Sequence, residues 1–318
     1  NYVSESERDL LTDEMSAEWF EKKIDWIKQN QNNNQPFFIA TGFIRPHTPL
    51  VVPKKYYDKF PLNKIKITEK LKDDLIDTKF SENLKETRGH KAWRLLSQGY
   101  GSEDKGLKIF TQAYLASINF ADEMVGRVLD ALDKSSYAKN TIVILFSDHG
   151  YLLGQKDHLW KYNLWEETTR VPLIIRQPNN DNNAGKTVAH PVSLIDIFPT
   201  ISDYCSLKGN TLKSEKGKNP NGFSLKPFVE KPELETWDGP EEALTVVASW
   251  KSKLPEKQHL AIRTERYRYI KYFDGSEELY DHEKDSNEWE NLAEDKNYRE
   301  IVKEMRIRLQ KRTDNYID

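Results

Sequence analysis

The chain has 318 residues, which is long enough for one large and one small domain. Its 48 Lys and Arg nearly balance its 51 Asp and Glu, giving a net charge of −3, so the composition argues against a strongly basic nucleic-acid-binding surface. A single cysteine excludes a disulfide framework within the chain. No apolar run reaches the roughly 18 residues of a membrane-spanning helix. From the balanced charge and the lack of such a run, we expect neither nucleic acid nor a membrane as a partner.

The first part of the chain predicts two helices and a strand. Apolar residues recur at helical spacing over residues 16–29, with Ser16 as the predicted N-cap. Residues 37–43 form an apolar run that is typical of a buried strand. Residues 54–105 are rich in Lys, Asp and Glu without a clear period, so we expect a surface excursion with short helices. Apolar residues over 110–132 predict one long amphipathic helix that covers a sheet.

The second part of the chain predicts mainly strands. Residues 141–147 and 171–176 are typical of strands, and residues 193–204 of a helix. Cys205 follows this helix, and we expect its thiol to pack in the interior. Short antiparallel strands and a final helix are predicted over residues 243–250, 259–264, 267–273, 278–280 and 298–312.

This order of elements indicates an α/β fold, a layered sheet flanked by helices, with a smaller C-terminal α+β subdomain. We place the large α/β domain at residues 1–207. Residues 208–240 are dense in Lys, Gly, Pro and Asn, which makes them the best candidate for the connection between domains. Residues 241–318 then form the small subdomain with antiparallel strands and a terminal helix.

One segment combines groups that suit an anion and a metal ion. The apolar run 141–146 leads to Asp148 and His149 in a glycine-flanked turn, and Lys161 follows twelve positions after the histidine. Open α/β sheets bind ligands beyond the carboxyl ends of their strands, where this turn is expected. Taken alone, an Asp-His-Gly sequence is more often a solvated turn, so its interpretation depends on the surrounding residues.

Those surroundings resemble the sulfatase family of the alkaline phosphatase superfamily, in the branch related to iduronate-2-sulfatase. The resemblance rests on three blocks that occur in the family's order and together cover nearly the full chain. They are Arg45-Pro46-His47-Thr48-Pro49 with the apolar run before it, Ser147-Asp148-His149-Gly150 through Lys161 to Ile174, and Arg266-Tyr267-Arg268-Tyr269-Ile270 with residues 278–281 and 288–292. The last block is similar to the small C-terminal subdomain of bacterial sulfatases.

Two elements of the family pattern do not occur in this sequence. Sulfatases carry two adjacent aspartates that bind calcium, and a Cys or Ser in a Cys/Ser-x-Pro/Ala-x-Arg motif that is oxidised to formylglycine. Cys205 has no arginine four positions on, so we identify no nucleophile in this chain. The resemblance implies that a missing N-terminal segment of the same protein supplies both elements, and that the 318 residues alone are inactive.

The resemblance assigns roles to four residues. Asp148 is implied as a ligand of one Ca²⁺, a hard cation that prefers carboxylate oxygen. His149 occupies the next ligand position, but calcium prefers oxygen to imidazole nitrogen, so contact with the sulfate or the aldehyde hydrate is the alternative. Lys161 is implied as the ammonium that holds a sulfate oxygen. His47 is implied to bind sulfate and to protonate the leaving oxygen, which suits a side chain that titrates near neutrality.

Further residues in the matching loops are candidates for a sugar-binding pocket. Arg45 could pair with a uronate carboxylate or a second sulfate, and aromatic rings could stack on a sugar face. The candidates for contact with the sugar are Arg45, Tyr151, His158 and Trp160, beside the sulfate-binding residues His47 and Lys161.

The expected activity is therefore hydrolysis of sulfate monoesters on a sulfated carbohydrate or polysaccharide, by a calcium and formylglycine mechanism. Two alternatives stay open: a phosphatase or phosphodiesterase of the same superfamily, which would use two zinc ions, and a catalytically inactive sulfatase-like binding protein. The family resemblance implies a bacterial periplasmic or secreted location. Polysaccharide degradation is the process that this activity would serve.

Overall fold

The computed structural model describes residues 7–30, 35–207, 221–248, 252, 254 and 257–317. The chain divides into two compact units: unit 1 comprises Asn1–Glu69 and Arg94–Ile142, and unit 2 comprises Lys70–Trp93 and Val143–Asp318. This division does not follow the predicted boundary after residue 207, and the partition into residues 1–207, 208–240 and 241–318 stays a prediction. Residues 208–220 of the predicted connection lie outside the described residues.

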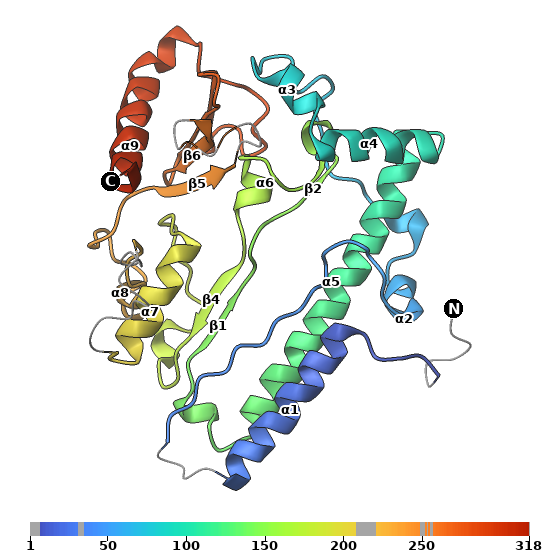
Figure 1. Ribbon diagram of the computed structural model, residues 1–318, viewed down its shortest axis with the longest axis vertical. Helices are drawn as coiled ribbons and strands as arrows, with labels where there is room; N and C mark the ends of the chain where they lie inside the picture. The colour runs from blue at the N-terminus through green and yellow to red at the C-terminus, as the bar shows by residue number, and fades with distance from the viewer. Residues whose placement is uncertain are drawn as a thin grey trace. The chain divides into compact units, whose positions relative to one another are not determined.

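Unit 1 is built on two long helices, α1 (Thr12–Asn30) and α5 (Glu103–Asp133), which lie side by side (Figure 1). The predicted long helix is thus confirmed and extends at both ends. Ser102 caps α5, because its side chain accepts a hydrogen bond from the backbone N–H of Lys105. Ala17 packs with Phe120 and other apolar side chains of α5 in a buried core that also includes α2 (Lys54–Asp58).

The start of α1 differs from the prediction. The helix begins at Thr12, four residues before Ser16, and the N-cap role predicted for Ser16 is wrong. Acidic residues in the first turn are stabilised by the helix dipole, and here they also bind the chain around them. Glu14 accepts a hydrogen bond from the backbone of Leu11, and Asp13 accepts from the backbone N–H groups of Ile44 and Arg45 at 2.8 and 2.9 Å.

The predicted strand over residues 37–43 is not observed. A strand is defined by a ladder of backbone hydrogen bonds to a neighbour, and no such ladder joins this segment to another described residue. Phe38 leaves 74% of its surface exposed, which also contradicts the predicted burial. The apolar run therefore gave the wrong secondary structure within the described chain.

The predicted short helices in residues 54–105 are observed. Besides α2 they are η1 (Leu62–Lys64), α3 (Ser81–Lys85) and α4 (Arg88–Gly99). The region is not only a surface excursion, however. Leu75, Phe80 and Leu84 are buried in the core of unit 2.

A two-stranded antiparallel sheet in unit 2 carries the Asp-His turn. β1 (Val143–Phe146) pairs with β4 (Leu173–Arg176), with Phe146 opposite Leu173, which confirms both predicted strands. Phe146 remains 48% exposed, so β1 is less buried than predicted. The chain between the two strands contains β2 (Leu152–Leu153), η3 (Gln155–Asp157), β3 (Leu159–Trp160) and α6 (Glu166–Thr169).

A short helical region follows β4. It contains η4 (Asp181–Asn183), η5 (Leu194–Asp196), α7 (Ile197–Tyr204) and α8 (Lys226–Glu230). The predicted helix over residues 193–204 is confirmed, and Pro199 lies in the first turn of α7, where its missing N–H costs no hydrogen bond. Cys205 is exposed, so the predicted interior thiol is wrong: the helix ends there and its last residues face solvent.

The C-terminal part of unit 2 is an antiparallel sheet covered by a helix (Figure 1). Its elements are β5 (Ala243–Val247), β6 (His259–Arg263), β7 (Tyr267–Lys271), β8 (Glu277–Asp281), η7 (Lys296–Tyr298) and α9 (Arg299–Ile317). Val302, Met305 and Leu309 of α9 pack on one face of this sheet. The other face packs against Leu152, Leu164 and Trp165 of the segment between β1 and β4. The predicted antiparallel strands and final helix are thus observed.

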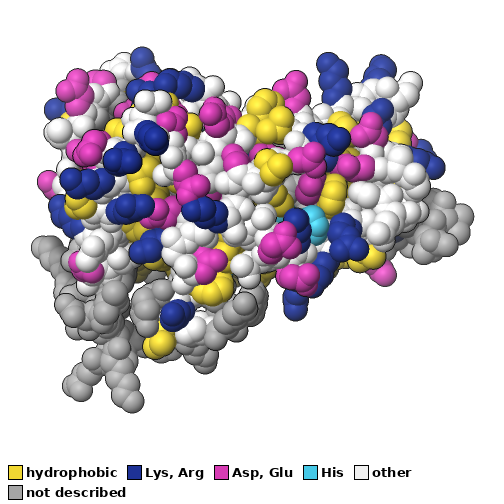
Figure 2. Space-filling model, turned by 90° about the horizontal axis from the view of Figure 1, so that it is seen from above, with side chains coloured by type: hydrophobic (Ala, Val, Ile, Leu, Met, Phe, Trp, Pro, Cys, Tyr) yellow, Lys and Arg dark blue, Asp and Glu magenta, His cyan; other side chains and the backbone are white. Residues whose placement is uncertain are grey.

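None of the helices in the described part of the chain combines the length and the apolar character needed to cross a bilayer. On the face shown in Figure 2, Lys and Arg side chains are interspersed with Asp and Glu, as the balanced composition predicts.

Candidate functional site

The turn after β1 is backed closely by α6. The backbone N–H groups of Gly150 and Tyr151 donate to the carbonyl oxygens of Thr168 and Glu167 at 2.9 and 2.7 Å. A Cβ atom at Gly150 would lie only 2.0 Å from the Glu167 carbonyl oxygen. Glycine is therefore required here for close approach of two backbone segments.

Asp148, His149 and Lys161 meet at this turn. Lys161 Nζ lies 2.6 Å from His149 Nε2, and His149 Nε2 lies 3.5 Å from an Asp148 carboxylate oxygen. His149 Nδ1 lies 2.8 Å from the Gly150 carbonyl oxygen, which can only accept a hydrogen bond. The contacts therefore fit an imidazole that carries its proton on Nδ1 and accepts from the lysine ammonium at Nε2.

The Asp148 carboxylate suits a hard metal ion. Its side chain is 81% exposed, whereas that of His149 is only 23% exposed. Calcium takes about six to eight oxygen ligands, of which Asp148 supplies at most two. Nε2 of His149 lies 2.6 Å from Lys161 Nζ, so in this arrangement the imidazole is engaged by the lysine ammonium.

The residues beside Lys161 have unusual backbone conformations. Trp160 and Tyr162 have positive φ angles of 73° and 70°, a region in which bulky side chains are rare. Two such residues around a charged side chain are typical of functional sites. Trp160 Nε1 is buried without a hydrogen-bond partner, so this indole N–H is a donor that the described residues leave unused.

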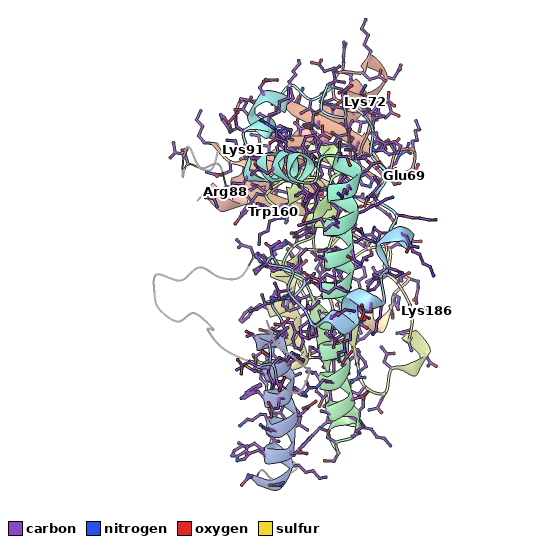
Figure 3. The ribbon with its side chains drawn as sticks, turned by 90° about the vertical axis from the view of Figure 1, so that its right-hand side faces the viewer. Glu69, Lys72, Arg88, Lys91, Trp160 and Lys186 are labelled. Carbon is purple, nitrogen blue, oxygen red and sulfur yellow. The ribbon has the colours of Figure 1, made fainter. Side chains whose placement is uncertain are left out.

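The start of α4 lies against the strand that carries Trp160. A Cβ atom at Gly89 would come within 2.5 Å of the Leu159 carbonyl oxygen. In Figure 3, the labelled side chains of Arg88 and Lys91 on α4 lie in the same region of the view as Trp160.

His158 is completely buried, with 0% of its surface exposed. Its Nδ1 lies 2.5 Å from the carbonyl oxygen of Lys156, and its Nε2 lies 2.9 Å from Thr87 Oγ1. Both ring nitrogens are thus engaged inside unit 2. This position does not suit the contact with a sugar that the sequence predicted, and it favours a role in holding the loop.

Burial lowers the pKa of His158 from 6.5 to about 4. Because the unfolded histidine takes up its proton near its ordinary pKa, its contribution to stability is present above that pH and is lost as the pH falls toward 4. We therefore expect the stability difference between the natural protein and His158→Gln to shrink by about 3 kcal/mol between about pH 7 and pH 4. Urea unfolding at the two pH values measures this; an equal difference at both would contradict the prediction.

Arg45 and His47 belong to unit 1, so their predicted convergence with Asp148 and Lys161 stays a prediction. Arg45 Nε donates to the Val51 carbonyl oxygen at 3.0 Å. His47 is exposed, and its Nδ1 lies 2.7 Å from the Thr48 carbonyl oxygen.

A buried charged cluster behind the turn was not predicted as part of the site. Glu166, His282 and Glu288 place ligand atoms within 4.8 Å of one another, as a metal site would. Two arginines already occupy these carboxylates: Arg268 contacts both Glu166 and Glu288, and Arg263 Nε donates to Glu166 at 3.1 Å. The group is therefore an ion-pair network. Arg268 and Glu288 belong to the third family block, but no local pattern in the sequence indicates that they are buried.

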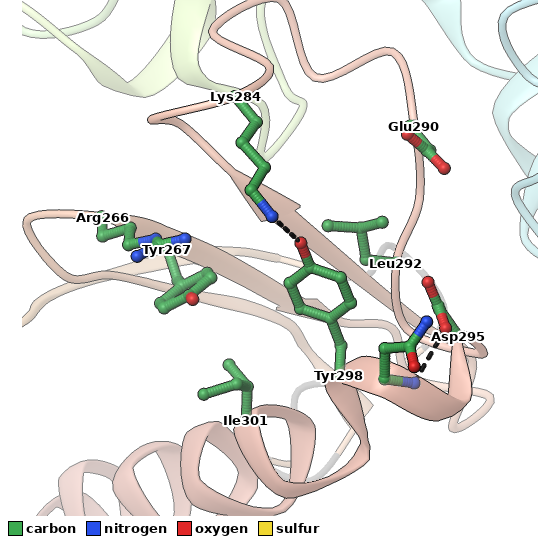
Figure 4. Close-up of a pocket in the computed structure, with 9 residues that line it drawn as sticks. Arg266, Tyr267, Lys284, Glu290, Leu292, Asp295, Tyr298 and Ile301 are labelled. Carbon is green, nitrogen blue, oxygen red and sulfur yellow. Dashed lines mark hydrogen bonds between the residues drawn. The ribbon is translucent and has the colours of Figure 1, made fainter.

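A groove of about 590 Å³ lies elsewhere on the C-terminal sheet and does not contain any of the predicted site residues (Figure 4). Its cations are paired within the protein. Arg266 binds both carboxylate oxygens of Asp281, and Lys284 Nζ donates to the hydroxyl of Tyr298 at 2.8 Å. We therefore place the candidate site at the turn after β1.

The sequence matches known families over most of its length. Residues 1–206 match the family described as Sulfatase, and residues 154–315 match N-sulphoglucosamine sulphohydrolase, C-terminal. A sulfatase of Formosa agariphila is 36% identical over 293 residues, covering 91% of this chain and 52% of that protein. Human iduronate 2-sulfatase is 31% identical over 202 residues, covering 62% of this chain and 35% of that protein. Several curated relatives match along most of this chain, and the chain spans only about half of their length.

Solved structures confirm the predicted fold class. A protein in complex with its substrate D-glucosamine-2-N,6-O-disulfate has a TM-score of 0.74 and 22% identity, covering 95% of this chain and 70% of that one. The phosphonate monoester hydrolase of Agrobacterium radiobacter has a TM-score of 0.71 and 24% identity, covering 93% of this chain and 60% of that one. The α/β architecture with its C-terminal sheet is thus that of these enzymes, and the family match supports the resemblance seen in the sequence. The chain belongs to the sulfatase family.

Proposed function

We propose that this protein hydrolyses sulfate monoesters on a sulfated carbohydrate. The observation that carries the proposal is the contact between Lys161 and His149 beside an exposed Asp148, in a chain of the sulfatase family. An ammonium and a neighbouring carboxylate that can hold a cation suit the binding of a tetrahedral oxyanion.

In this proposal the residues of the chain bind the sulfate group and move one proton. Lys161 Nζ donates to a sulfate oxygen, and His149 fixes the ammonium through its Nε2 atom at 2.6 Å. His47 binds the sulfate and protonates the sugar oxygen as it leaves, because a free alkoxide is a poor leaving group. Stabilising the developing charge with preorganised donors is the main contribution of such a site.

Asp148 would hold one calcium ion, together with ligands that this sequence does not contain. When bound, such an ion polarises the oxyanion and brings charged groups together. The nucleophile, a formylglycine, would belong to a segment of the same protein that precedes this one. This chain alone is then expected to have negligible turnover.

The sugar would lie against Arg45, Tyr151 and Trp160. Relatives named for carbohydrate substrates support this class: an N-acetylglucosamine-6-O-sulfatase of Bacteroides thetaiotaomicron is 29% identical over 211 residues, and a Formosa agariphila protein is called an ulvan-active sulfatase. A periplasmic or secreted location, where such polymers are met, is part of the proposal.

A phosphoryl or phosphonyl hydrolase is the second candidate, since the fold is shared with phosphonate monoester hydrolases. The test is release of inorganic sulfate or phosphate by the full-length protein from matched sulfate and phosphate esters of one alcohol. We expect sulfate release to be faster. Faster phosphate release with two zinc ions bound would favour the second candidate, and release of neither would favour a binding protein.

Asp148→Asn is expected to weaken calcium binding to the full-length protein and to lower sulfate release by at least about 100-fold, because an amide carries no charge to hold the cation. Metal analysis and activity at rising calcium concentration measure both effects. Asp274→Asn, in the turn between β7 and β8, is the control. Unchanged calcium content in Asp148→Asn would contradict the role of this carboxylate.

A further inference from the structure

Buried charged residues of the C-terminal part of unit 2 contact the segment between β1 and β4, which carries Lys161. We propose that Arg268, with its carboxylate partners Glu166 and Glu288, is a positioning residue that holds α6 and thereby the Asp148, His149 and Lys161 cluster in place. This inference rests on the proposed function for its catalytic meaning, whereas the positioning itself rests on contacts alone.

Arg268 contacts two residues of the segment, Leu164 and Glu166, and the distant Glu288. It is 2% exposed, and its Nη1 donates to the carbonyl oxygen of Leu164 at 2.9 Å. Its Nη2 contacts the Glu166 carboxylate, and its Nε lies 2.7 Å from a carboxylate oxygen of Glu288 as an ion pair without hydrogen-bond geometry. A planar guanidinium can make these contacts in three directions at once, which an ammonium cannot.

Neighbouring contacts complete the attachment. Glu288 also accepts a hydrogen bond from the Glu166 backbone N–H at 2.9 Å, at the first residue of α6. Trp165 Nε1 donates to the buried carboxylate of Glu278 on β8 at 2.9 Å. Leu164, Trp165 and Glu166 are thus each held by a residue of the C-terminal part of unit 2.

The Glu166 carboxylate is stabilised in its charged form by the neighbouring arginines. Burial alone would raise the pKa of Glu166, but the charges of Arg268 and Arg263 outweigh burial and lower the pKa to about 2. The carboxylate therefore stays charged at neutral pH, and a buried charge without its partner is strongly unfavourable. The pairing of Glu166 with Arg268 and Arg263 therefore favours one position of α6.

The position of α6 is transmitted to the turn by backbone contacts. The carbonyl oxygens of Glu167 and Thr168 accept from Tyr151 and Gly150, directly after His149. The two backbone segments are already in hydrogen-bond contact at 2.9 and 2.7 Å, so α6 cannot move closer to the turn. A shift of α6 must therefore displace the turn.

The test uses Arg268→Lys and Glu166→Gln in the full-length protein, with Arg306→Gln as the matched control. Arg306 binds both carboxylate oxygens of Glu277 on the same sheet, but it is 55% exposed and touches no residue of the segment in the described structure. Amide hydrogen exchange of a peptide that covers Gly150 and Tyr151 is compared with that of peptides from β6 to β8.

In both test variants we expect exchange at Gly150 and Tyr151 to accelerate at least about tenfold while β6 to β8 stay protected, because only the local opening is affected. Sulfate turnover should fall about 10-fold to 100-fold in kcat, as for a misplaced catalytic group. Arg306→Gln should change neither.

Unchanged exchange at the turn in Glu166→Gln, or equal acceleration throughout β6 to β8, would overturn the inference. If Arg268→Lys does not fold, the milder Glu166→Gln decides. If the natural protein releases no sulfate, the proposed function fails, and the exchange comparison still decides whether Arg268 positions the turn.

Discussion

Replacing Lys161 with Gln is expected to lower kcat/KM of the full-length protein for a sulfate ester by about 100-fold to 1000-fold, the range found when one preorganised donor to a developing charge is removed. The amide still donates a hydrogen bond but carries no positive charge. The substitution also removes the ammonium from which His149 Nε2 accepts a hydrogen bond at 2.6 Å. Steady-state kinetics on a chromogenic sulfate ester measures the effect.

Lys186→Gln is the matched control for Lys161→Gln, because Lys186 is an exposed lysine of the same unit, as Figure 3 shows. It should leave kcat/KM unchanged. If Lys161 acts on the charge that develops during the reaction, kcat falls more than KM rises. A change in KM alone would mean that the ammonium binds substrate and transition state equally, and no change at all would remove Lys161 from the site.

Gly150→Ala is expected to abolish sulfate release and to destabilise the protein by more than about 2 kcal/mol, since a side chain that overfills a packed site forces backbone shifts. The added methyl would lie 2.0 Å from the Glu167 carbonyl oxygen and 3.1 Å from that of Arg170. Neither backbone atom can turn aside as a flexible side chain could. Chemical unfolding and sulfate release measure the two effects.

Gly126→Ala is the control for the glycine substitution. Gly126 lies within α5, and a Cβ atom there would meet nothing within 4 Å. Alanine in a helix is favoured over glycine, so this variant should be more stable by up to about 1 kcal/mol and fully active. Full activity in Gly150→Ala would show that α6 does not support the turn.

The sequence indicated much of the candidate site because its residues lie close together along the chain. Asp148 and His149 follow the end of β1, and Lys161 lies within the same segment, so a strand signal and one family block were enough to group them. The C-terminal sheet was predictable too, because its strands alternate and follow one another in a simple antiparallel order.

What the sequence did not predict depends on contacts between distant residues. His158 was predicted to contact the sugar, yet folding buries it against Leu84 and Thr87, some 70 positions away. Arg268 lies more than 100 positions from Leu164, and nothing local to either residue indicates that they meet. The run at residues 37–43 was misread because apolar composition does not reveal whether a strand has a neighbour to pair with.

The central proposal is that Lys161 and His47 bind one sulfate group, while His149 fixes Lys161 and Asp148 holds the cation beside it. It is tested most directly by a crystal structure of the full-length protein with calcium and a bound sulfate ester. We predict a sulfate oxygen within hydrogen-bonding distance of Lys161 Nζ, anomalous scattering from an ion at Asp148, and His47 beside the ester oxygen. A sulfate bound elsewhere, with these four side chains dispersed, would contradict the account.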